Sequence, residues 1–278
     1  MNVQIDMGQI QRIETEMLHE LNQVCSRHKI KYVIHAGSVL GAIRHKGPIP
    51  WDGDTDVLVA LPDLKFLIEC LRKELSDRFC VDFYDVNSSY SPLFPRIGLK
   101  NSSSDIVHVD LFPLVGIPDD PKAQIRFSKK SDRINFYYRF RYKKISRMEN
   151  LPAKRLIGVL LKAAMSLVPK TFFWRIFQKH CGKYPYESAN YVMNPCGHRG
   201  LKNIFAKEMF DRRIWVDYAH LKLPIPQNYD FYLKQYYKDY MSFPPKEIRE
   251  KGLSEAAWIS EADDRRFSQY GKSHEEVL

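Results

Sequence analysis

The stretch "IPWDGDTDV", residues 49–57, constrains this chain more than any other. Asp52, Asp54 and Asp56 occupy alternate positions, and β-branched or apolar residues follow them. Side chains alternate faces along a strand, so Asp54 and Asp56 are predicted to point the same way, about 7 Å apart along the backbone. Two anions on one face cost free energy unless a cation shares them. The question is therefore what keeps these carboxylates together.

Three interpretations of the acidic run compete. A solvated acidic turn is the ordinary explanation of such a pattern. A calcium-binding loop fails, because Val57 stands where that loop requires Gly and Asp63 stands at the twelfth position in place of Glu. Context favours a metal site shared by Asp54, Asp56 and Asp110, because oxygen ligands favour Mg²⁺ or Mn²⁺. Two such ions would suit phosphoryl transfer.

The preceding stretch, "HAGSVLGAIRHKG", adds candidate phosphate ligands. Gly37 lets a backbone approach a phosphate closely, and Ser38 can cap the following helix while it donates to an oxygen. Arg44 and Lys46 stand where they could reach a phosphate or a diphosphate, and we group Asp52 with these candidate substrate-binding residues. A plain helix cap for Ser38 and a solvated loop lysine for Lys46 are the simpler alternatives.

Hydrophobic periodicity predicts alternating helices and strands in the first part of the chain. A helix is expected over 8–28 and another over 62–79, with Phe66, Cys70 and Leu71 on one stripe. In the last predicted strand Asp110 shares a face with His108, while the apolar neighbours take the other face. The strands are expected at 31–37, 54–60, 80–86, 94–100 and 105–114.

Charge divides the chain into two parts. Residues 122–183 carry 17 Lys or Arg but only Asp132 and Glu149, whereas the whole chain has a net charge of +10. The remainder is therefore mildly acidic, and the basic segment is expected to attract an anionic partner. Loop-rich stretches around 191–200 and a closing helix around 228–240 should follow it. We predict an α/β core over 1–118 with a helical, basic second half, 119–278, packed on it.

Three segments together resemble the signature of the LicD family, which includes the fukutin-related proteins. They are "HAGSVLGAIRHKGPIPWDGDTDVLV", "HVDLFPL" and "LPIPQNYDFYLKQYYKDYMSFPP", and they span about residues 30–245. The middle of the chain is too divergent to align with the family. Gly53 stands where the family often has another Asp, and Lys238 where a Gly often follows the tyrosine.

The resemblance implies a nucleotidyltransferase-like mixed sheet and a metal-dependent phosphotransferase. The donor would be a CDP-activated alcohol such as CDP-choline, and the acceptor a hydroxyl of a cell-surface or lipid-linked glycan (lipopolysaccharide, teichoic acid or capsule). It also implies that Asp54 and Asp56 bind the metal ions, with Asp110 as the third carboxylate. We expect Asp110 to help remove the hydroxyl proton, because a metal-bound alcohol needs only a modest base.

The basic middle segment has two equal explanations. "RINFYYRFRYKKISR", residues 133–147, alternates cations with rings, and the apolar stretch 156–177 includes Trp174 and Arg175. Such a segment can contact an anionic membrane surface or a lipid-linked acceptor, or it can form ordinary helices packed on the core. Nucleic acid is the weakest alternative, because no recognised binding module accompanies the charge.

The expected location is the cytoplasm, with peripheral contact on the inner face of the membrane. No stretch reaches the roughly 18 apolar residues that a spanning helix needs. The first twenty residues show no apolar signal core. Five cysteines without tight spacing favour a reducing compartment.

Two accessory sites remain open from the sequence. Two Cys and two His between 180 and 198 could close a zinc site, although their spacing is unfamiliar; they are His180, Cys181, Cys196 and His198. A choline-type head group would bind in an aromatic cage. The candidate rings are Tyr137, Tyr138, Tyr191, Trp215 and Tyr229.

Two other functions are weighed against the phosphotransferase. A nucleotidyltransferase of the same fold would move the nucleotide itself onto a small molecule and release pyrophosphate. A non-catalytic anion-binding protein would use the basic helices, would not depend on Mg²⁺, and would still bind its partner after loss of Asp54.

Overall fold

The computed structural model describes residues 2–83, 92–100, 106–140, 142, 152–197, 199–254 and 256–260. The helices are α1 (Met7–Arg27), α2 (Ala36–His45), α3 (Leu61–Glu74), α4 (Pro121–Phe140), α5 (Pro152–Leu167), α6 (Lys170–Cys181), η2 (Gly200–Asn203), α7 (Glu208–Asp211), α8 (Tyr229–Tyr237) and α9 (Lys246–Leu253). The strands are β1 (Asn2–Ile5), β2 (Tyr32–Ile34), β3 (Thr55–Ala60), β4 (Phe79–Asp82), β5 (Arg96–Leu99), β6 (His108–Ile117), β7 (Tyr191–Met193), β8 (Ile204–Ala206), β9 (Arg213–Tyr218), β10 (Leu221–Pro226) and β11 (Ala257–Ser260).

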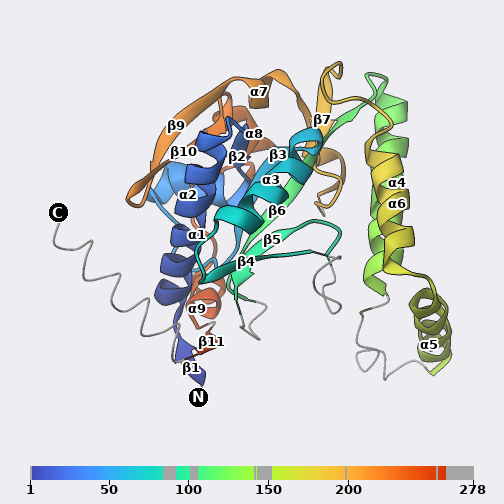
Figure 1. Cartoon of the computed structure of the whole chain (residues 1–278), viewed down its shortest axis with the longest axis horizontal. Coiled ribbons are helices and arrows are strands. Elements are labelled where there is room, and N and C mark those ends of the chain that lie inside the picture. Colours follow the sequence, from blue (N-terminus) through green and yellow to red (C-terminus); the bar gives the residue numbers. More distant parts are fainter. Residues whose placement is uncertain are drawn as a thin grey trace.

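A mixed sheet with strand order β2-β3-β6-β5-β4 forms the centre of the molecule (Figure 1). Strands β3 and β6 are parallel, and the remaining pairs along this order are antiparallel. The expected α/β fold class is confirmed. A parallel pair needs a crossover connection, and α3 lies in the segment between β3 and β6.

The second half contributes strands as well as helices. Strand β7 pairs with the end of β6, and β8 pairs with β7. The loop expected around 191–200 was therefore wrong in its first residues, because a three-residue strand is too short to leave a periodic signal in the sequence. Strands β9 and β10 form a hairpin, and β1 pairs with β11 near the opposite end of the chain.

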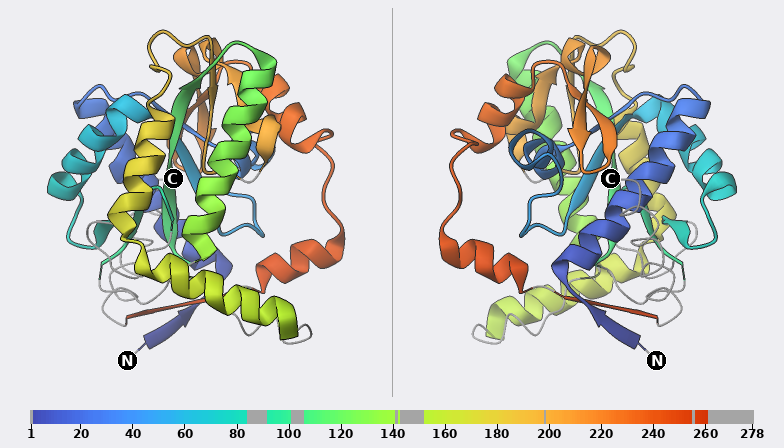
Figure 2. Two further views of the ribbon diagram at one scale, coloured as in Figure 1. Left: turned by 90° about the vertical axis from the view of Figure 1, so that its right-hand side faces the viewer. Right: turned by 90° about the vertical axis from the view of Figure 1, so that its left-hand side faces the viewer.

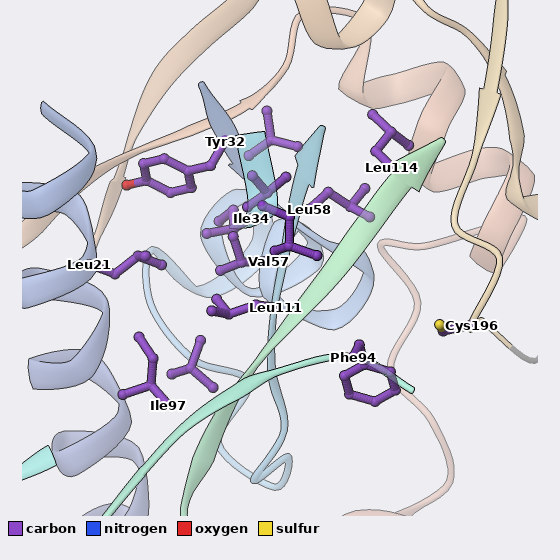
Figure 3. Packing of buried hydrophobic residues seen from close by; sticks show 14 of the residues in the cluster. Leu21, Tyr32, Ile34, Val57, Leu58, Phe94, Ile97, Leu111, Leu114 and Cys196 are labelled. Atoms are coloured by element: carbon purple, nitrogen blue, oxygen red, sulfur yellow. The ribbon is translucent and has the colours of Figure 1, made fainter. Parts of the chain in front are cut away.

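Helix α1 covers one face of the sheet, as its apolar stripe predicts. Asp6 caps its first turn in a capping box with Gln9. Figure 3 shows Leu21 pointing toward Val57 and Leu111, which lie on β3 and β6. Because side chains alternate along both strands, the neighbouring residues of β3 and β6 point away from α1, toward the opposite face.

Helix α3 departs from the predicted stripe at one position. Cys70 and Leu71 are buried, but Phe66 is 50% exposed. Pro62 lies in the first turn of the helix, as expected. The spacing of Phe66 alone suggested burial, but its ring packs edge-on against His28 at the surface instead.

Helices α4, α5 and α6 form a layer at the side of the sheet (Figures 1 and 2). Within it, the His180 ring stacks on Phe127 at 4.0 Å, and its Nε2 lies 2.9 Å from Ser131 Oγ. Trp174 of α6 packs on Phe83, which follows β4. Among the described residues, no helix is both long enough and apolar enough to span a bilayer.

Candidate active site

The parallel pairing of β3 and β6 brings two of the predicted ligands side by side. The register opposes Asp56 and Asp110, so their side chains leave neighbouring strands on the same face. Adjacent strands lie about 4.8 Å apart. Asp54 is exposed, one residue before β3 begins. Its negative charge contributes to a higher pKa of both Asp56 and Asp110, so all three carboxylates lie within electrostatic reach of one another.

The two strand carboxylates resist ionisation. Burial, then the charges of Asp110, Asp54 and Asp52, raises the pKa of Asp56 well above its usual value. Burial also raises the pKa of Asp110 to about 7, although Arg96 acts in the opposite direction. Packing like charges in this way costs stability, and such groups are concentrated at functional sites.

Asp52 approaches the first turn of α2. A Cβ added to Gly37 would lie only 3.0 Å from Asp52 Oδ2, so glycine allows this close contact. The Asp52 segment is fixed from α1, because Gln11 Nε2 donates to the carbonyls of Asp52 and Ile49 at 2.9 and 2.8 Å. The first amides of a helix have no partner within it and attract anions.

Ser38 has a different role from the one expected. Helix α2 begins at Ala36 and its N-cap is His35, so the prediction that Ser38 caps the helix was wrong. Ser38 is buried in the first turn, and its Oγ accepts a hydrogen bond from the Asp56 amide at 3.0 Å. The His35 amide in turn donates to the Asp56 carbonyl at 2.8 Å. The start of α2 is therefore attached directly to the strand that carries Asp56.

A residue far along the chain holds this helix start in place. Ala36 has φ of +44°, a conformation that is unfavourable for a residue with a Cβ. The Tyr232 hydroxyl accepts from the Ala36 amide at 2.9 Å and lies 2.5 Å from His35 Nδ1. Burial, with a contribution from Arg199, lowers the pKa of His35 to about 3, so this histidine is neutral.

Arg44 and Lys46 lie at the opposite end of α2 from Gly37. At a rise of 1.5 Å per residue, the separation along the helix is about 10 to 14 Å. Arg44 Nη1 donates to the carbonyls of Tyr240 and Ser242. Lys46 is exposed at the C-cap in the left-handed conformation. Arg44 also lies over the Trp51 ring at 5.8 Å, and the phosphate-binding role of both cations stays a prediction.

Two arginines and a histidine that we did not predict lie around Asp110. Arg96 Nε and His108 Nε2 lie 3.3 and 3.4 Å from Asp110 Oδ1, and the charge of Arg139 also lowers the Asp110 pKa. Arg96 opposes Asp110 across the antiparallel β5–β6 pair. His108 shared a predicted face with Asp110, so strand alternation contained a signal for it. Arg96 and Arg139 carried no comparable signal.

Arg199 and two tyrosines of α8 lie near Asp56. The Arg199 guanidinium stacks over Tyr236 and Tyr237 at 4.8 and 4.7 Å, and its charge lowers the pKa of Asp56. Burial raises the pKa of Tyr237 to about 12, with contributions from Asp52 and Asp56. The tyrosines belong to the C-terminal signature segment, whereas no motif in the sequence pointed to Arg199.

Glu14 places another carboxyl group on the α1 side of β3. It is buried, and it accepts a hydrogen bond from Thr55 Oγ1 at 2.7 Å. Burial raises the pKa of Glu14 well above its usual value, and Asp54 and Asp52 add to the effect. A protonated Glu14 at neutral pH would add no further negative charge to the site.

The accessory sites receive little support. The candidate cage rings lie on four different elements, α4, β7, β9 and α8. One of them, Tyr138, is buried against Tyr142 and Phe173. For the zinc site, His198 lies outside the described residues, so the prediction is untested. His180 is engaged with Ser131.

A separate potential metal cluster consists of His28, Cys70 and Glu74. It lies at the surface between α1 and α3, away from the β3–β6 carboxylates. Glu74 already forms an ion pair with Arg27 at 2.8 Å and a second contact with His28. The nearby guanidinium disfavours a further cation, so the pairing explains the cluster without a metal.

Comparison with known proteins agrees with this geometry. The LicD/FKTN/FKRP nucleotidyltransferase domain matches residues 29–163, which include β3, β6 and all three carboxylates. The lipopolysaccharide cholinephosphotransferase LicD of Haemophilus influenzae is 27% identical over 254 residues, covering 87% of this chain and 94% of the relative. Uncharacterized proteins of Rickettsia prowazekii and Rickettsia typhi are each 38% identical over 42 residues, 15% of this chain and 16% and 14% of theirs. Residues 29–163 thus match the LicD/FKTN/FKRP nucleotidyltransferase domain, and most of the chain is similar to a LicD protein.

Proposed function

We propose that this protein transfers a substituted phosphate, such as phosphocholine, from a CDP-activated alcohol to a hydroxyl of a cell-surface or lipid-linked glycan. The observation that carries the proposal is the paired register of Asp56 and Asp110 beside the first turn of α2. The likeness to a cholinephosphotransferase over most of both chains supports the reaction class.

The residues present fit divalent metal ions. Asp54, Asp56 and Asp110 offer only oxygen ligands, which suits Mg²⁺ or Mn²⁺, and burial together with the neighbouring negative charges raises the pKa of the buried pair. A cation shared among them would relieve that repulsion. When bound, one or two such ions would neutralise the diphosphate and stabilise the charge that develops on the leaving group. Metal dependence is therefore part of the proposal.

The remaining residues of the site have complementary roles. The start of α2 at Gly37, with the partial positive charge of a helix N-terminus, binds the donor phosphate, and Arg199 adds a guanidinium whose charge reaches Asp56. The acceptor oxygen attacks the phosphorus of the substituted phosphate, its bond to the CMP oxygen breaks, and CMP leaves. Asp110 accepts the hydroxyl proton, because a metal-bound alcohol needs only a modest base.

The test compares two substrates in one assay. Purified protein is incubated with glycan acceptor, Mg²⁺ and either labelled CDP-choline or CTP. Release of CMP together with labelled glycan is the expected result, and CDP-ribitol and CDP-glycerol are tested in the same way. Pyrophosphate released from CTP instead would assign a nucleotidyltransferase. Salt-sensitive anion binding that needs no Mg²⁺, without turnover of any donor, would make the protein non-catalytic.

The proposal also includes a location. A glycan built on a lipid carrier is held at the membrane, and the basic segment 122–183 would keep the enzyme there. We place the protein in the cytoplasm, peripheral on the inner face of the membrane. Cell fractionation before and after a high-salt wash tests this, because an electrostatically held protein is released by salt.

A further inference from the structure

Helix α5 exposes an apolar stripe. Leu160, Ala163, Ala164 and Leu167 recur at helical spacing and are all exposed, with exposed fractions of 61% for Leu160 and 86% for Leu167. Met165, on another side of the helix, packs against the core. Both sides of α5 are thus apolar, whereas a surface helix normally turns a polar face to water.

Helix α6, which follows α5 along the chain, also exposes apolar side chains, together with cations. Phe172, Arg175, Ile176 and Lys179 are exposed at the same helical spacing, and Phe172 is 51% exposed. The other side of α6 is buried in the core through Phe173, Trp174 and Phe177. Rings and aliphatic side chains alternating with cations are typical of a helix that lies at a membrane–water interface.

The position of α5 leaves its stripe accessible. Figures 1 and 2 show α5 at the edge of the molecule, beyond the ends of α4 and α6 and away from the central sheet. Phe136 of α4 adds a further apolar side chain to this layer, at 54% exposed. We call the outward residues of α5 and α6, namely Leu160, Ala163, Ala164, Leu167, Phe172, Arg175, Ile176 and Lys179, the docking face.

Charge decides which occupant the docking face fits. The segments 152–167 and 170–181 contain no Asp or Glu, and residues 122–183 carry 17 Lys or Arg. A second copy of the chain would bring the same positive charge and be repelled. An anionic bilayer offers both things that the face needs, an apolar layer for the leucines and negative headgroups for the cations.

We propose that the docking face inserts into the headgroup layer of an anionic lipid bilayer, with α5 lying along the surface. The leucines contact the upper acyl chains, and Arg175 and Lys179 pair with lipid phosphates. This deepens the proposed membrane location by naming the element that produces it. It does not depend on the proposed chemistry, because vesicle binding needs neither donor nor acceptor.

The experiment uses the full chain and vesicles of phosphatidylcholine, with or without phosphatidylglycerol, in a flotation assay. We expect binding to the anionic vesicles only, weakened by salt. The double variant Leu160→Ser, Leu167→Ser should bind these vesicles more than tenfold more weakly than the parent protein, because each substitution removes apolar surface from the inserted face. Arg175→Gln with Lys179→Gln should weaken binding at low salt and flatten the salt dependence.

Phe66→Ser is the control, since Phe66 is also an exposed apolar side chain but lies on α3. It should bind like the parent protein, and circular dichroism and thermal unfolding establish that each variant is folded. Equal binding of the leucine variant and the parent would overturn the proposal, as would no binding to anionic vesicles. A dimer in solution that the leucine substitutions dissociate would also overturn it, by assigning the face to a second copy. Turnover of a soluble acceptor by the leucine variant separates this question from the function.

Discussion

The surface carboxylate of Glu74 and the buried carboxylates of Asp56 and Asp110 have opposite surroundings. Glu74 lies between Arg27 and His28, whose hydrogen bonds hold the pKa of its carboxyl below the usual value. Asp56 and Asp110 lie beside each other on adjacent strands, where burial and like charge raise the pKa of both. The surface carboxylate is stabilised by its neighbours, while the strand carboxylates are destabilised by theirs.

We propose that the difference separates a structural from a functional use of charge. A paired carboxylate supports the fold and needs nothing further. Like charges packed on one face reduce stability, so their retention is explained by a partner that binds there or by chemistry that needs them. The predictions below test this contrast, beginning with the largest expected effect.

Asp56→Asn and Asp110→Asn should each lower transferase turnover by about a thousandfold or more, because each removes a carboxylate from the proposed metal site. Glu74→Gln should leave turnover unchanged. Release of CMP from CDP-choline by each purified variant measures the effect. Activity of either Asn variant close to that of the parent would remove the functional half of the contrast.

Mg²⁺ should stabilise the parent protein by about 2.7 kcal/mol at a hundredfold its dissociation constant. Asp56→Asn should lose that response, yet unfold at a higher denaturant concentration than the parent in chelator, because one of two repelling charges is gone. Glu74→Gln should show the reverse, with lower stability and an intact Mg²⁺ response. Denaturant unfolding with Mg²⁺ and with EDTA provides the comparison, and an equal Mg²⁺ response in both variants would contradict it.

Tyr232→Phe should reduce stability by about 1–3 kcal/mol, because the Ala36 amide loses its partner in a buried position. The same change should lower turnover, since it frees the strained start of α2 beside Asp56. Tyr32→Phe is the control, because it removes a buried hydroxyl that donates to Asn22 away from the carboxylates. Loss of stability without loss of activity in Tyr232→Phe would show that this helix start has no part in the reaction.

The smallest effect concerns a buried base. Burial lowers the pKa of His180 to about 4, and Lys130 adds to the shift. Between about pH 6.5 and 4 the unfolded chain binds a proton at this histidine that the folded protein excludes. The free energy of unfolding therefore decreases as the pH is lowered, by at most about 1.4 kcal/mol per pH unit from this residue. His180→Gln should remove that part of the slope. Urea unfolding at pH 7, 6 and 5 measures it, and identical slopes would contradict burial as the cause.

Local sequence determined much of what surrounds the site. The stripe of α1, the strand at Asp54–Ala60 and the alternation that turns Asp110 away from Val109 all follow from periods of 3.6 and 2 residues. These patterns are short-range, because each residue's face depends on its immediate neighbours along the chain. The acidic run was therefore recognisable before any pairing of strands was known.

Tertiary structure alone decided which groups meet. Asp56 and Asp110 are neighbours only because β3 and β6 pair in parallel at one register. The start of α2 at Ala36 is held by Tyr232, 196 residues further along the chain, and Arg96 reaches Asp110 from a third strand. Such contacts depend on how whole elements pack, and local propensity contains no information about the distance between them.

The pattern of residues was sufficient to place Asp56 and Asp110 on strands with Asp54 beside them, and it predicts an oxygen-rich site for a hard cation. It could not specify the cations around Asp110 or the true start of α2, nor show that the docking face points outward. Those features depend on contacts between segments that are distant in the sequence. Such contacts form only when the segments pack together and exclude water, so the local sequence does not specify them.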